Sequence, residues 1–305
     1  MLRKSKWSVF KKALPLTLML LPGVILIFTF CYVPMVGLLL PFKDYKASLG
    51  FFGSPWAGLE NFKYLFHSNT MWVALRNTVC YNLIFIFLGN LCSVLLASML
   101  FELSAKHVKV YQTILLLPYF VSWVVASYVV NAFLDMDAGV INNLLTKLGI
   151  NEVLWYNDPD GWPIIIMIAY LWKSVGYNTI IYYAALMGLD VECFEAAQLD
   201  GVTWFQKLRY IMIPGIQSMI WIMVIMAVGN VLRGDFGLFY NVPLNSALLY
   251  STTDVVDTVV YRSLMKIGDI GMSSAAGFFQ SVCGFVLIVI VNHIVKKKNP
   301  ENALF

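Results

Sequence analysis

Long runs without a charged side chain are the sequence feature that most constrains how this chain can fold. The first run extends from Ala13 to Phe42, and the second from Asn77 to Phe101. An α-helix needs about 20 mainly apolar residues to cross a bilayer, and both runs exceed that length. Only 12% of the residues are charged, whereas soluble domains carry about a quarter. The chain is therefore predicted to be an all-α integral membrane protein.

Six segments of this kind are predicted along the chain. Their expected bounds are 15–40, 77–101, 110–134, 162–187, 210–232 and 271–295. The first is longer than the apolar region of a secretory signal, and no small-residue cleavage site follows it, so we expect a retained helix. Pro118 lies in the third span and predicts a kink there. Because no internal repeat or low-complexity linker separates the spans, we predict a single domain over residues 1–305.

The distribution of basic residues predicts which way the spans cross the membrane. Six spans place both chain termini on one side. The connections on that side are short and rich in Lys and Arg, including the lysine triplet at 296–298, whereas the opposite connections are longer and less densely basic. Cytoplasmic connections of membrane proteins are enriched in Lys and Arg. Both termini, and the connection between the fourth and fifth spans, are therefore predicted to be cytoplasmic.

That cytoplasmic connection, about residues 190–209, is strongly polar yet carries an amphipathic pattern. Asp190 can cap a short helix, and Gly201 suits a break between two short helices. Apolar residues recur at helical spacing in both halves, namely Phe194 with Ala197 and Phe205 with Leu208. A pair of amphipathic helices between two spans is expected to be covered by a partner.

A second amphipathic segment is predicted outside the cytoplasm, in the connection 233–269. Five apolar residues there share one side of a helix. They are Val255, Val256, Val259, Val260 and Leu264.

The cytoplasmic connection also carries a distinctive spacing of residues. It begins with Glu-Ala-Ala, which is followed after three residues by Gly. After nine further residues comes Ile, and then, one residue later, an aliphatic residue directly followed by Pro. The positions are Glu195, Ala196, Ala197, Gly201, Ile211, Ile213 and Pro214. This spacing resembles the EAA loop of the permease subunits of bacterial ABC importers of the binding-protein-dependent, type I class, which more often have Leu at position 213.

Other stretches resemble one branch of that family, the sugar permeases that handle oligosaccharides and polysaccharide fragments. They are Trp172 to Tyr182, Gly277 to Ser281 and the basic tail. The resemblance covers nearly the whole chain. It implies a multi-pass subunit of an oligosaccharide importer in the bacterial cytoplasmic membrane.

The resemblance also implies partners and residue roles. The chain would pair with a second homologous permease, expected as a heterodimer, with two ATP-binding subunits and with an extracellular or periplasmic sugar-binding protein. Glu195 would be the charged contact to the ATPase, Ala196 and Ala197 the close-packing positions, and Gly201 the turn, with Pro214 closing the motif. No nucleic-acid partner is expected. An importer permease for amino acids or peptides and a polytopic membrane enzyme or sensor remain alternatives.

Several kinds of chemistry are missing from the sequence. There is no Gly-x-x-x-x-Gly-Lys-Ser/Thr loop, so ATP and Mg²⁺ are expected only in partner ATPase subunits. The three histidines and five cysteines are scattered, so no metal site is predicted. An enzyme within the membrane should show a nucleophile or metal cluster, and no catalytic residue is predicted here. Paired carboxylates are absent from the spans, which disfavours a proton-driven carrier.

Polar and aromatic side chains form a stripe on one face of the fourth predicted span. They are Tyr170, Lys173, Ser174, Tyr177 and Asn178. Polar groups facing lipid are costly, so this face is predicted to line a cavity, where rings and hydrogen-bonding groups would suit a sugar. Trp172, beside the stripe, and Gln280, on the sixth span, are further candidates for the substrate path. For the sixth span, packing between helices is favoured over a place in the path.

Lys173 is the only charge between Asp160 and Asp190. A lysine at mid-span costs at least roughly 2.5–3.5 kcal/mol on insertion scales, so it needs a partner or water. Two explanations stay open. Lys173 would either pair with an acid or with helix carbonyls of the second permease, or face a wet cavity and meet the hydroxyls or a carboxylate of a sugar.

Overall fold

The computed structural model describes residues 6–298, 300 and 303–304. The described part is helical and contains no β-strand, and an isolated antiparallel bridge joins Lys43 to Trp56. This confirms the all-α prediction.

Four helices are long: α1 (Lys6–Ile27), α4 (Asn69–Phe101), α8 (Trp162–Leu186) and α16 (Ile270–Lys298). Shorter helices in the body are α5 (Ala105–Phe120), α6 (Trp123–Leu134), α10 (Trp204–Lys207), α11 (Ile213–Gly215) and α12 (Gln217–Gly229). The connections contain α2 (Gly50–Gly53), α3 (Glu60–His67), α7 (Val140–Lys147), α9 (Val191–Leu199), α13 (Phe236–Asn241), α14 (Tyr250–Thr253) and α15 (Val256–Arg262). Irregular helical turns are η1 (Phe28–Tyr32), η2 (Val33–Phe42), η3 (Leu208–Met212), η4 (Ala247–Leu249) and η5 (Ser263–Ile267).

Four helical segments of the described part are long and apolar enough to cross a membrane, or up to six if each of two bent pairs is one span. The continuous segments are Thr17–Phe42, Asn69–Phe101, Trp162–Leu186 and Ile270–Lys297. The bent pairs are Ala105–Phe120 with Trp123–Leu134, at 98°, and Trp204–Gly215 with Gln217–Gly229, at 67°. The helix α4 begins at Asn69, where the Ser68 side chain caps it by accepting from the amide of Met71.

The predicted kink at Pro118 is a complete break between α5 and α6. Pro118 has no backbone N–H to continue the helical ladder, and α5 ends at Phe120. Val121 and Ser122 are extended, and the Ser122 side chain accepts from the amide of Val125 to start α6. A break of this kind leaves carbonyls at the end of α5 without helical donors.

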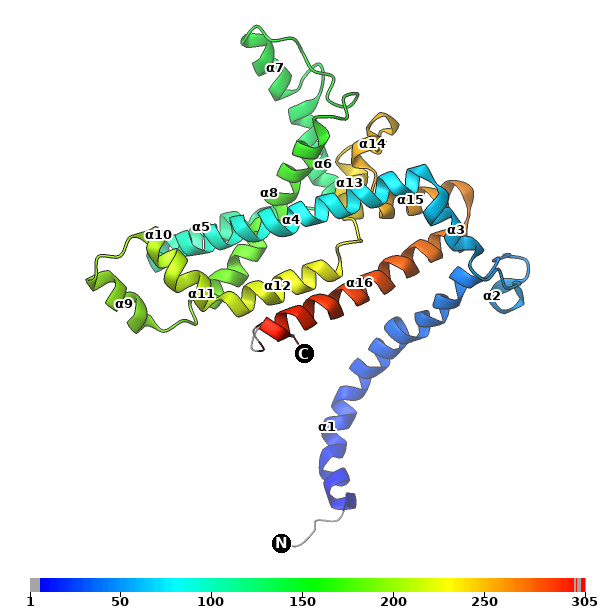
Figure 1. Cartoon of the computed structure of the whole chain (residues 1–305), viewed down its shortest axis with the longest axis horizontal. Helices are drawn as coiled ribbons and strands as arrows, with labels where there is room; N and C mark the ends of the chain where they lie inside the picture. The colour runs from blue at the N-terminus through cyan, green and yellow to red at the C-terminus, as the bar shows by residue number, and fades with distance from the viewer. Residues whose placement is uncertain (1–5, 299, 301–302, 305) are drawn as a thin grey trace.

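The body is built around α4 and α8, which pack along each other, with α5 on α8 and α12 on α16. At Gly176 of α8, an added Cβ would lie 1.7 Å from the carbonyl oxygen of Leu115, so only glycine permits this approach of α5. Figure 1 shows α9 and α10 at one end of this body and α2, α3 and α15 at the other.

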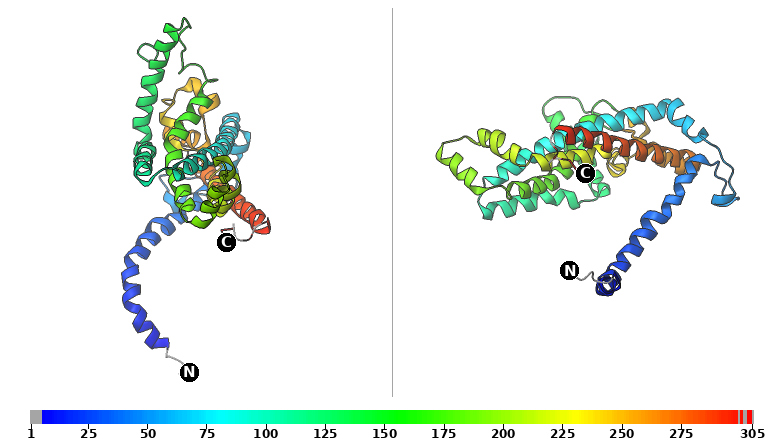
Figure 2. Two further views of the ribbon diagram at one scale, coloured as in Figure 1. Left: turned by 90° about the vertical axis from the view of Figure 1, so that its left-hand side faces the viewer. Right: turned by 60° about the horizontal axis from the view of Figure 1, so that its bottom comes forward.

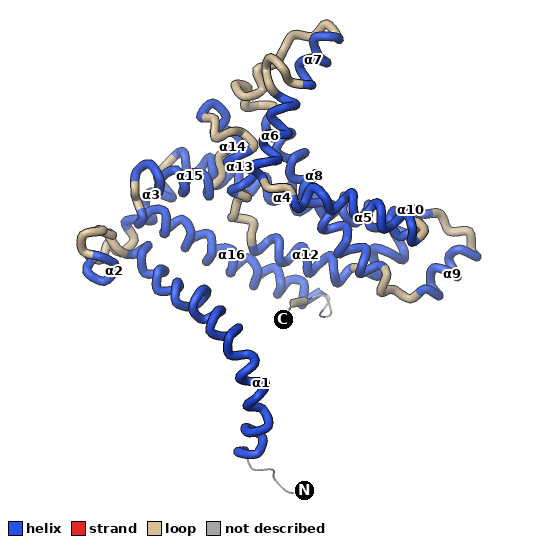
Figure 3. Tube along the Cα trace, turned by 180° about the vertical axis from the view of Figure 1, so that it is seen from behind, coloured by secondary structure: helices blue, strands red, loops and turns tan. Residues whose placement is uncertain are grey.

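The helix α1 stands away from the body in Figure 1 and in both views of Figure 2. Figure 3 shows from behind that its N-terminal end is remote from the other helices. The most apolar window of the segment Thr17–Phe42 is 0% buried inside the chain. Its apolar surface must therefore be covered by lipid or by another protein.

The connection 233–269 folds back over the body as α13, α14 and α15. The predicted amphipathic helix corresponds to α15, in which Val256 and Val259 are buried. They pack with Met71 and Ala74 of α4 and with Ala276 of α16. This connection therefore belongs to the hydrophobic core rather than forming a loose loop.

Candidate functional site

Residues 190–209 form the two short helices that the sequence predicts. The Asp190 side chain accepts a hydrogen bond from the amide of Glu192 at 3.1 Å and starts α9. Gly201 has a φ of +67°, a left-handed conformation that favours glycine, and it separates α9 from α10. Thr203 and Gln206 then form a reciprocal capping box at the start of α10. Local capping thus fixes the shape of this segment.

One side of this segment is covered by the chain itself. The Phe194 ring lies 4.7 Å from the Phe101 ring, centroid to centroid, and Ala197 is 6% exposed. Leu208 and Met212 are buried against Tyr182 and neighbouring residues of α4 and α8. The ends of α4 and α8 therefore cover Phe194, Ala197 and Leu208, whereas Phe205 stays 62% exposed and available to a partner.

The opposite side of the segment is exposed and partly apolar. Leu199 is 90% exposed, Phe205 is 62% exposed, and Glu195 and Ala196 are exposed beside them. A leucine and a phenylalanine this exposed on a polar segment are typical of a protein-binding surface. The structure thus separates an inner packing side, with Ala197, from an outer side, with Glu195, Ala196 and Leu199.

An ion pair ties the segment to α4. Lys207 Nζ lies 2.6 Å from Glu102 Oε1 and 2.8 Å from Oε2, and Glu102 is the residue that ends α4. Together with the contact between Phe101 and Phe194, this pair links residues 190–209 to the end of the second span. The pairing is not predictable from sequence spacing, because the two residues are far apart in the chain.

The stripe on α8 divides into separate environments. The Tyr170 ring stacks on Phe85 of α4 with centroids 3.8 Å apart, whereas the Tyr177 ring stacks on Tyr119 of α5 at 4.5 Å. Tyr177 remains 42% exposed, and Asn178 beside it is half-buried. Trp172 is 45% exposed and lines an apolar hollow of about 400 Å³ between α6 and α8. The stripe is therefore not one continuous polar face.

Lys173 binds the break between α5 and α6. Its ammonium donates to the carbonyl of Tyr119 at 2.9 Å, to that of Pro118 at 3.5 Å and to that of Val121. It also lies 5.2 Å from the centroid of the Trp123 ring, whose Nε1 donates to Asp235 Oδ2 at 2.7 Å. A cation at a helix C-terminus satisfies free carbonyls and the helix dipole. Helix carbonyls were one expected partner, but these belong to this chain and not to a second permease.

Gln280 is buried, with 6% of its surface exposed. Its Nε2 donates to the Leu232 carbonyl at 2.7 Å and to Asp257 Oδ2 at 3.1 Å. The same Asp257 oxygen accepts from the amide of Gly234 at 2.6 Å. Burial raises the pKa of the Asp257 carboxyl, and these two hydrogen bonds act in the opposite direction. This geometry supports a role for Gln280 in helix packing. Its side chain holds α16 to the segment that follows α12.

Sequence reasoning missed Trp123, Asp235 and Glu102 as members of these arrangements. Trp123 follows the Pro118 break closely, and Asp235 accepts from the amide of Leu238 to start α13. The sequence near each of these residues indicates only a helix start or end. The contacts with Lys173, Trp123 and Lys207 join residues that are far apart in the chain.

Comparison with known proteins identifies related chains. The family described as binding-protein-dependent transport system inner membrane component matches residues 89–300. Protein LplB of Bacillus subtilis is 34% identical over 98% of this chain and 92% of its own length. The polygalacturonan/rhamnogalacturonan transport system permease protein YteP of the same organism is 32% identical over 94% of this chain and 89% of its own.

A solved structure is similar over nearly its whole length. It is the crystal structure of a bacterial alginate ABC transporter in complex with an alginate pentasaccharide-bound periplasmic protein. The TM-score is 0.86 at 31% identity, covering 96% of this chain and 98% of the compared chain. With the family match over residues 89–300, this similarity extends from the apolar helices to the segment with Glu195 and Gly201. The chain therefore belongs to the family of inner membrane components of binding-protein-dependent transport systems.

Proposed function

We propose that this chain is a transmembrane subunit of an ATP-driven importer that moves oligosaccharides into the bacterial cytoplasm. The packing of residues 190–209 carries this proposal. Their inner side is fixed to α4 and α8, while their outer side exposes Leu199 and Phe205. A partner bound to the outer side would move two spans together.

The partner proposed for this surface is an ATPase subunit. Glu195 and Ala196 lie exposed next to Leu199, where a groove on a second protein could receive them. Closure of two ATPase subunits around ATP and Mg²⁺ would displace the segment. The pair Glu102–Lys207 and the rings of Phe101 and Phe194 would pass that movement to α4, shifting the bundle between inward-open and outward-open states.

A second homologous permease is proposed to complete the bundle. The exposed α1 and the apolar hollow beside Trp172 leave apolar surface that this chain does not cover. The break between α5 and α6 and the Tyr177 ring would then face the partner across a translocation path. Both termini are proposed to lie in the cytoplasm, on the side of residues 190–209.

Two similarities support an oligosaccharide as the substrate. YteP is described as a transport protein for polygalacturonan and rhamnogalacturonan, and the compared crystal structure contains a periplasmic protein bound to an alginate pentasaccharide. Both relatives match nearly the whole chain. We propose that an extracellular sugar-binding protein delivers the substrate to the end of the molecule that carries α2, α3 and α15. Tyr177, Asn178 and Trp172 are the proposed path residues on α8, with Lys173 and Tyr170 shaping that face.

The experiment that tests this function is reconstitution of the complete complex in proteoliposomes. The complex, purified with its ATPase and binding protein, is supplied with a mixed digest of uronate-containing and neutral polysaccharides, together with amino acids and short peptides. The expected result is uptake of one class of oligosaccharide that requires ATP and the binding protein, identified by mass spectrometry. Uptake of amino acids or peptides alone would support the alternative substrate class. Failure of any ATPase to co-purify would contradict the importer assignment.

A further inference from the structure

A turn in the connection 233–269 has an unusual backbone. Leu244 and Asn245 have φ values of +54° and +48°, and they are the non-glycine residues with positive φ in the described part of the chain. Asparagine tolerates this region, but leucine pays a steric cost there. Such a conformation persists only where surrounding contacts impose it, and it occurs often at ligand-binding sites.

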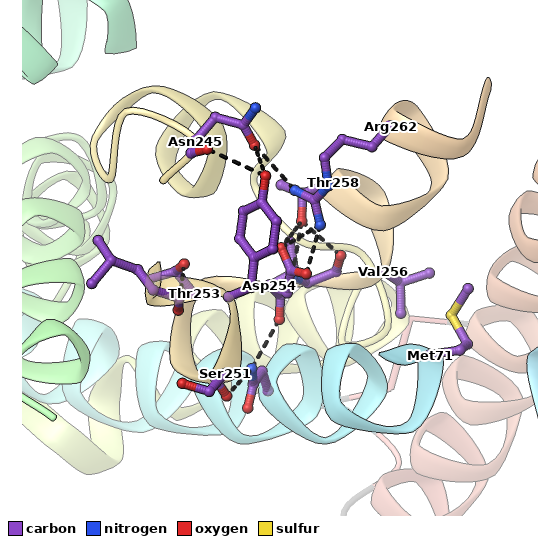
Figure 4. A network of polar contacts seen from close by, with 12 residues as sticks. Met71, Asn245, Ser251, Thr253, Asp254, Val256, Thr258 and Arg262 are labelled. Carbon is purple, nitrogen blue, oxygen red and sulfur yellow. Dashed lines mark hydrogen bonds and ion pairs between the residues drawn. The ribbon is translucent and has the colours of Figure 1, made fainter. Parts of the chain in front are cut away.

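A buried network imposes this conformation on Asn245 (Figure 4). The Tyr250 hydroxyl donates to the Asn245 carbonyl at 3.2 Å and to its Oδ1 at 3.0 Å, and Arg262 Nη1 donates to the same Oδ1 at 3.2 Å. Arg262 in turn pairs with Asp254 at 2.6 Å and lies 3.9 Å above the Tyr250 ring. Asp254 is 2% exposed, so the turn rests on a rigid, buried support.

The turn forms one wall of a hollow of about 340 Å³, whose other wall is α6. The lining residues are Val124, Ser127, Tyr128, Tyr240, Asn241, Leu244 and Asn245. Tyr128 is 70% exposed, so its ring and hydroxyl are accessible from outside the chain. Asn241 uses its side-chain nitrogen on the Gly237 carbonyl at 2.8 Å, which leaves its side-chain oxygen as an acceptor.

The chemistry of this hollow differs from that of the larger hollow beside Trp172. The larger one is lined by apolar and aromatic side chains alone, which suits a lipid chain or an apolar helix. The smaller one combines tyrosine rings with amide and hydroxyl groups, which together can stack on a pyranose and bond its hydroxyls.

We propose that the hollow between Tyr128, Asn241 and Asn245 is a subsite for one pyranose ring of the transported oligosaccharide. The proposal rests on the proposed function. Val124 and Tyr128 lie on α6 just beyond Trp123, and Trp123 contacts both Lys173 and Asp235 at the break in the span. The subsite would thus lie beyond that break, on the outer side, where a bound chain could extend from it toward Tyr177.

The test uses the reconstituted complex and the glycan it imports, in a long and a short form, with the binding protein saturated. Tyr128→Ala is expected to slow uptake of the long form about tenfold, the equivalent of one lost ring contact and one lost hydrogen bond. Tyr128→Phe keeps the ring and should slow it less. Uptake of a form too short to reach the hollow should be unchanged. Tyr111→Ala, at an exposed tyrosine of α5 outside the hollow, is the matched control.

A second measurement is independent of turnover. A cysteine at Leu244, which is 51% exposed, should react with a membrane-impermeant maleimide, and the long glycan should slow that reaction in the complex. A labelling rate that is the same with and without the glycan would overturn the subsite. So would an equal loss of uptake for both glycan lengths in Tyr128→Ala, because that result would indicate a contact of Tyr128 with the binding protein. A parent complex that imports no glycan overturns the proposed function, and with it this subsite.

Discussion

Replacement of Lys173 by methionine tests how the break between α5 and α6 is held. Methionine keeps the length of the side chain and removes the ammonium that donates to the carbonyls of Tyr119, Pro118 and Val121. Each carbonyl left without a donor costs about 1–3 kcal/mol. Removal of a charge from mid-span recovers at least about 2.5–3.5 kcal/mol. The contact of 3.5 Å to Pro118 is weak, so mainly two carbonyls lose a donor, at about 1 kcal/mol each. The recovered insertion free energy offsets this loss, so the variant should insert, fold and assemble with the second permease.

The local effect should be large although the global effect is small. Loss of about 2 kcal/mol at the break corresponds to roughly thirtyfold easier local opening, because 1.4 kcal/mol is a factor of ten. Hydrogen exchange of the peptide covering residues 119–126 should accelerate by about that factor in Lys173→Met, and uptake should fall because the two halves of the span lose their fixed angle. Lys147→Met, at an exposed lysine of α7, is the control.

Two results would refute this reasoning. Unchanged exchange at residues 119–126 would mean that the carbonyl contacts do not hold the break. Failure of the variant to assemble would mean that Lys173 bridges to the second permease, as the sequence alone allowed. Normal exchange together with a changed preference between acidic and neutral glycans would place the ammonium in the substrate path instead.

Three further predictions concern residues 190–209. Gly201→Asp forces a φ of +67° on a residue with a side chain and adds a charge. ATPase association, measured by co-purification, should therefore be lost while membrane insertion is retained. Full ATP-dependent uptake by this variant would contradict the prediction. Glu102→Lys should reduce the amount of glycan imported per ATP hydrolysed, and the added change Lys207→Glu should restore it. Because the pair is partly exposed, assembly of the complex should change little. If the double variant does not recover, the ion pair has no part in coupling. Leu199→Asp should weaken ATPase binding at least about tenfold, because it puts a charge where a 90% exposed leucine is proposed to dock. Gln198→Asp is the neighbouring control. Equal ATPase binding by the two variants would mean that the docking surface lies elsewhere.

The general fold was predictable because membrane insertion depends on local properties of the sequence. Charge-free runs of sufficient length predicted an all-α membrane protein, and the all-α prediction is confirmed. The caps at Asp190 and Gly201 were predictable for the same reason, since helix starts and ends depend on a few neighbouring residues. After Pro118 the chain departs from a straight span. The proline predicted a kink there, but it did not predict the bend of 98° between α5 and α6.

The environments of the candidate residues could not be predicted, because they depend on contacts between distant parts of the chain. Periodicity placed Tyr170, Lys173 and Tyr177 on one face of α8. It could not show that Phe85 covers the first, that the end of α5 binds the second, or that Tyr119 stacks on the third. For Gln280 the sequence left helix packing and a path role both open, and only its contacts with Leu232 and Asp257 favour packing.

Site-specific crosslinking from Leu199 in intact cells tests the central claim most directly, because that side chain is the most exposed point of the proposed docking surface. A photo-crosslinking residue at position 199 should capture the ATPase subunit. The same residue at Ala197, which is buried against the chain itself, should capture none, and at Phe52, at the opposite end of the body and 84% exposed, it should capture the binding protein. Capture of the binding protein from position 199, or of the ATPase from position 52, would contradict both the orientation and the coupling role.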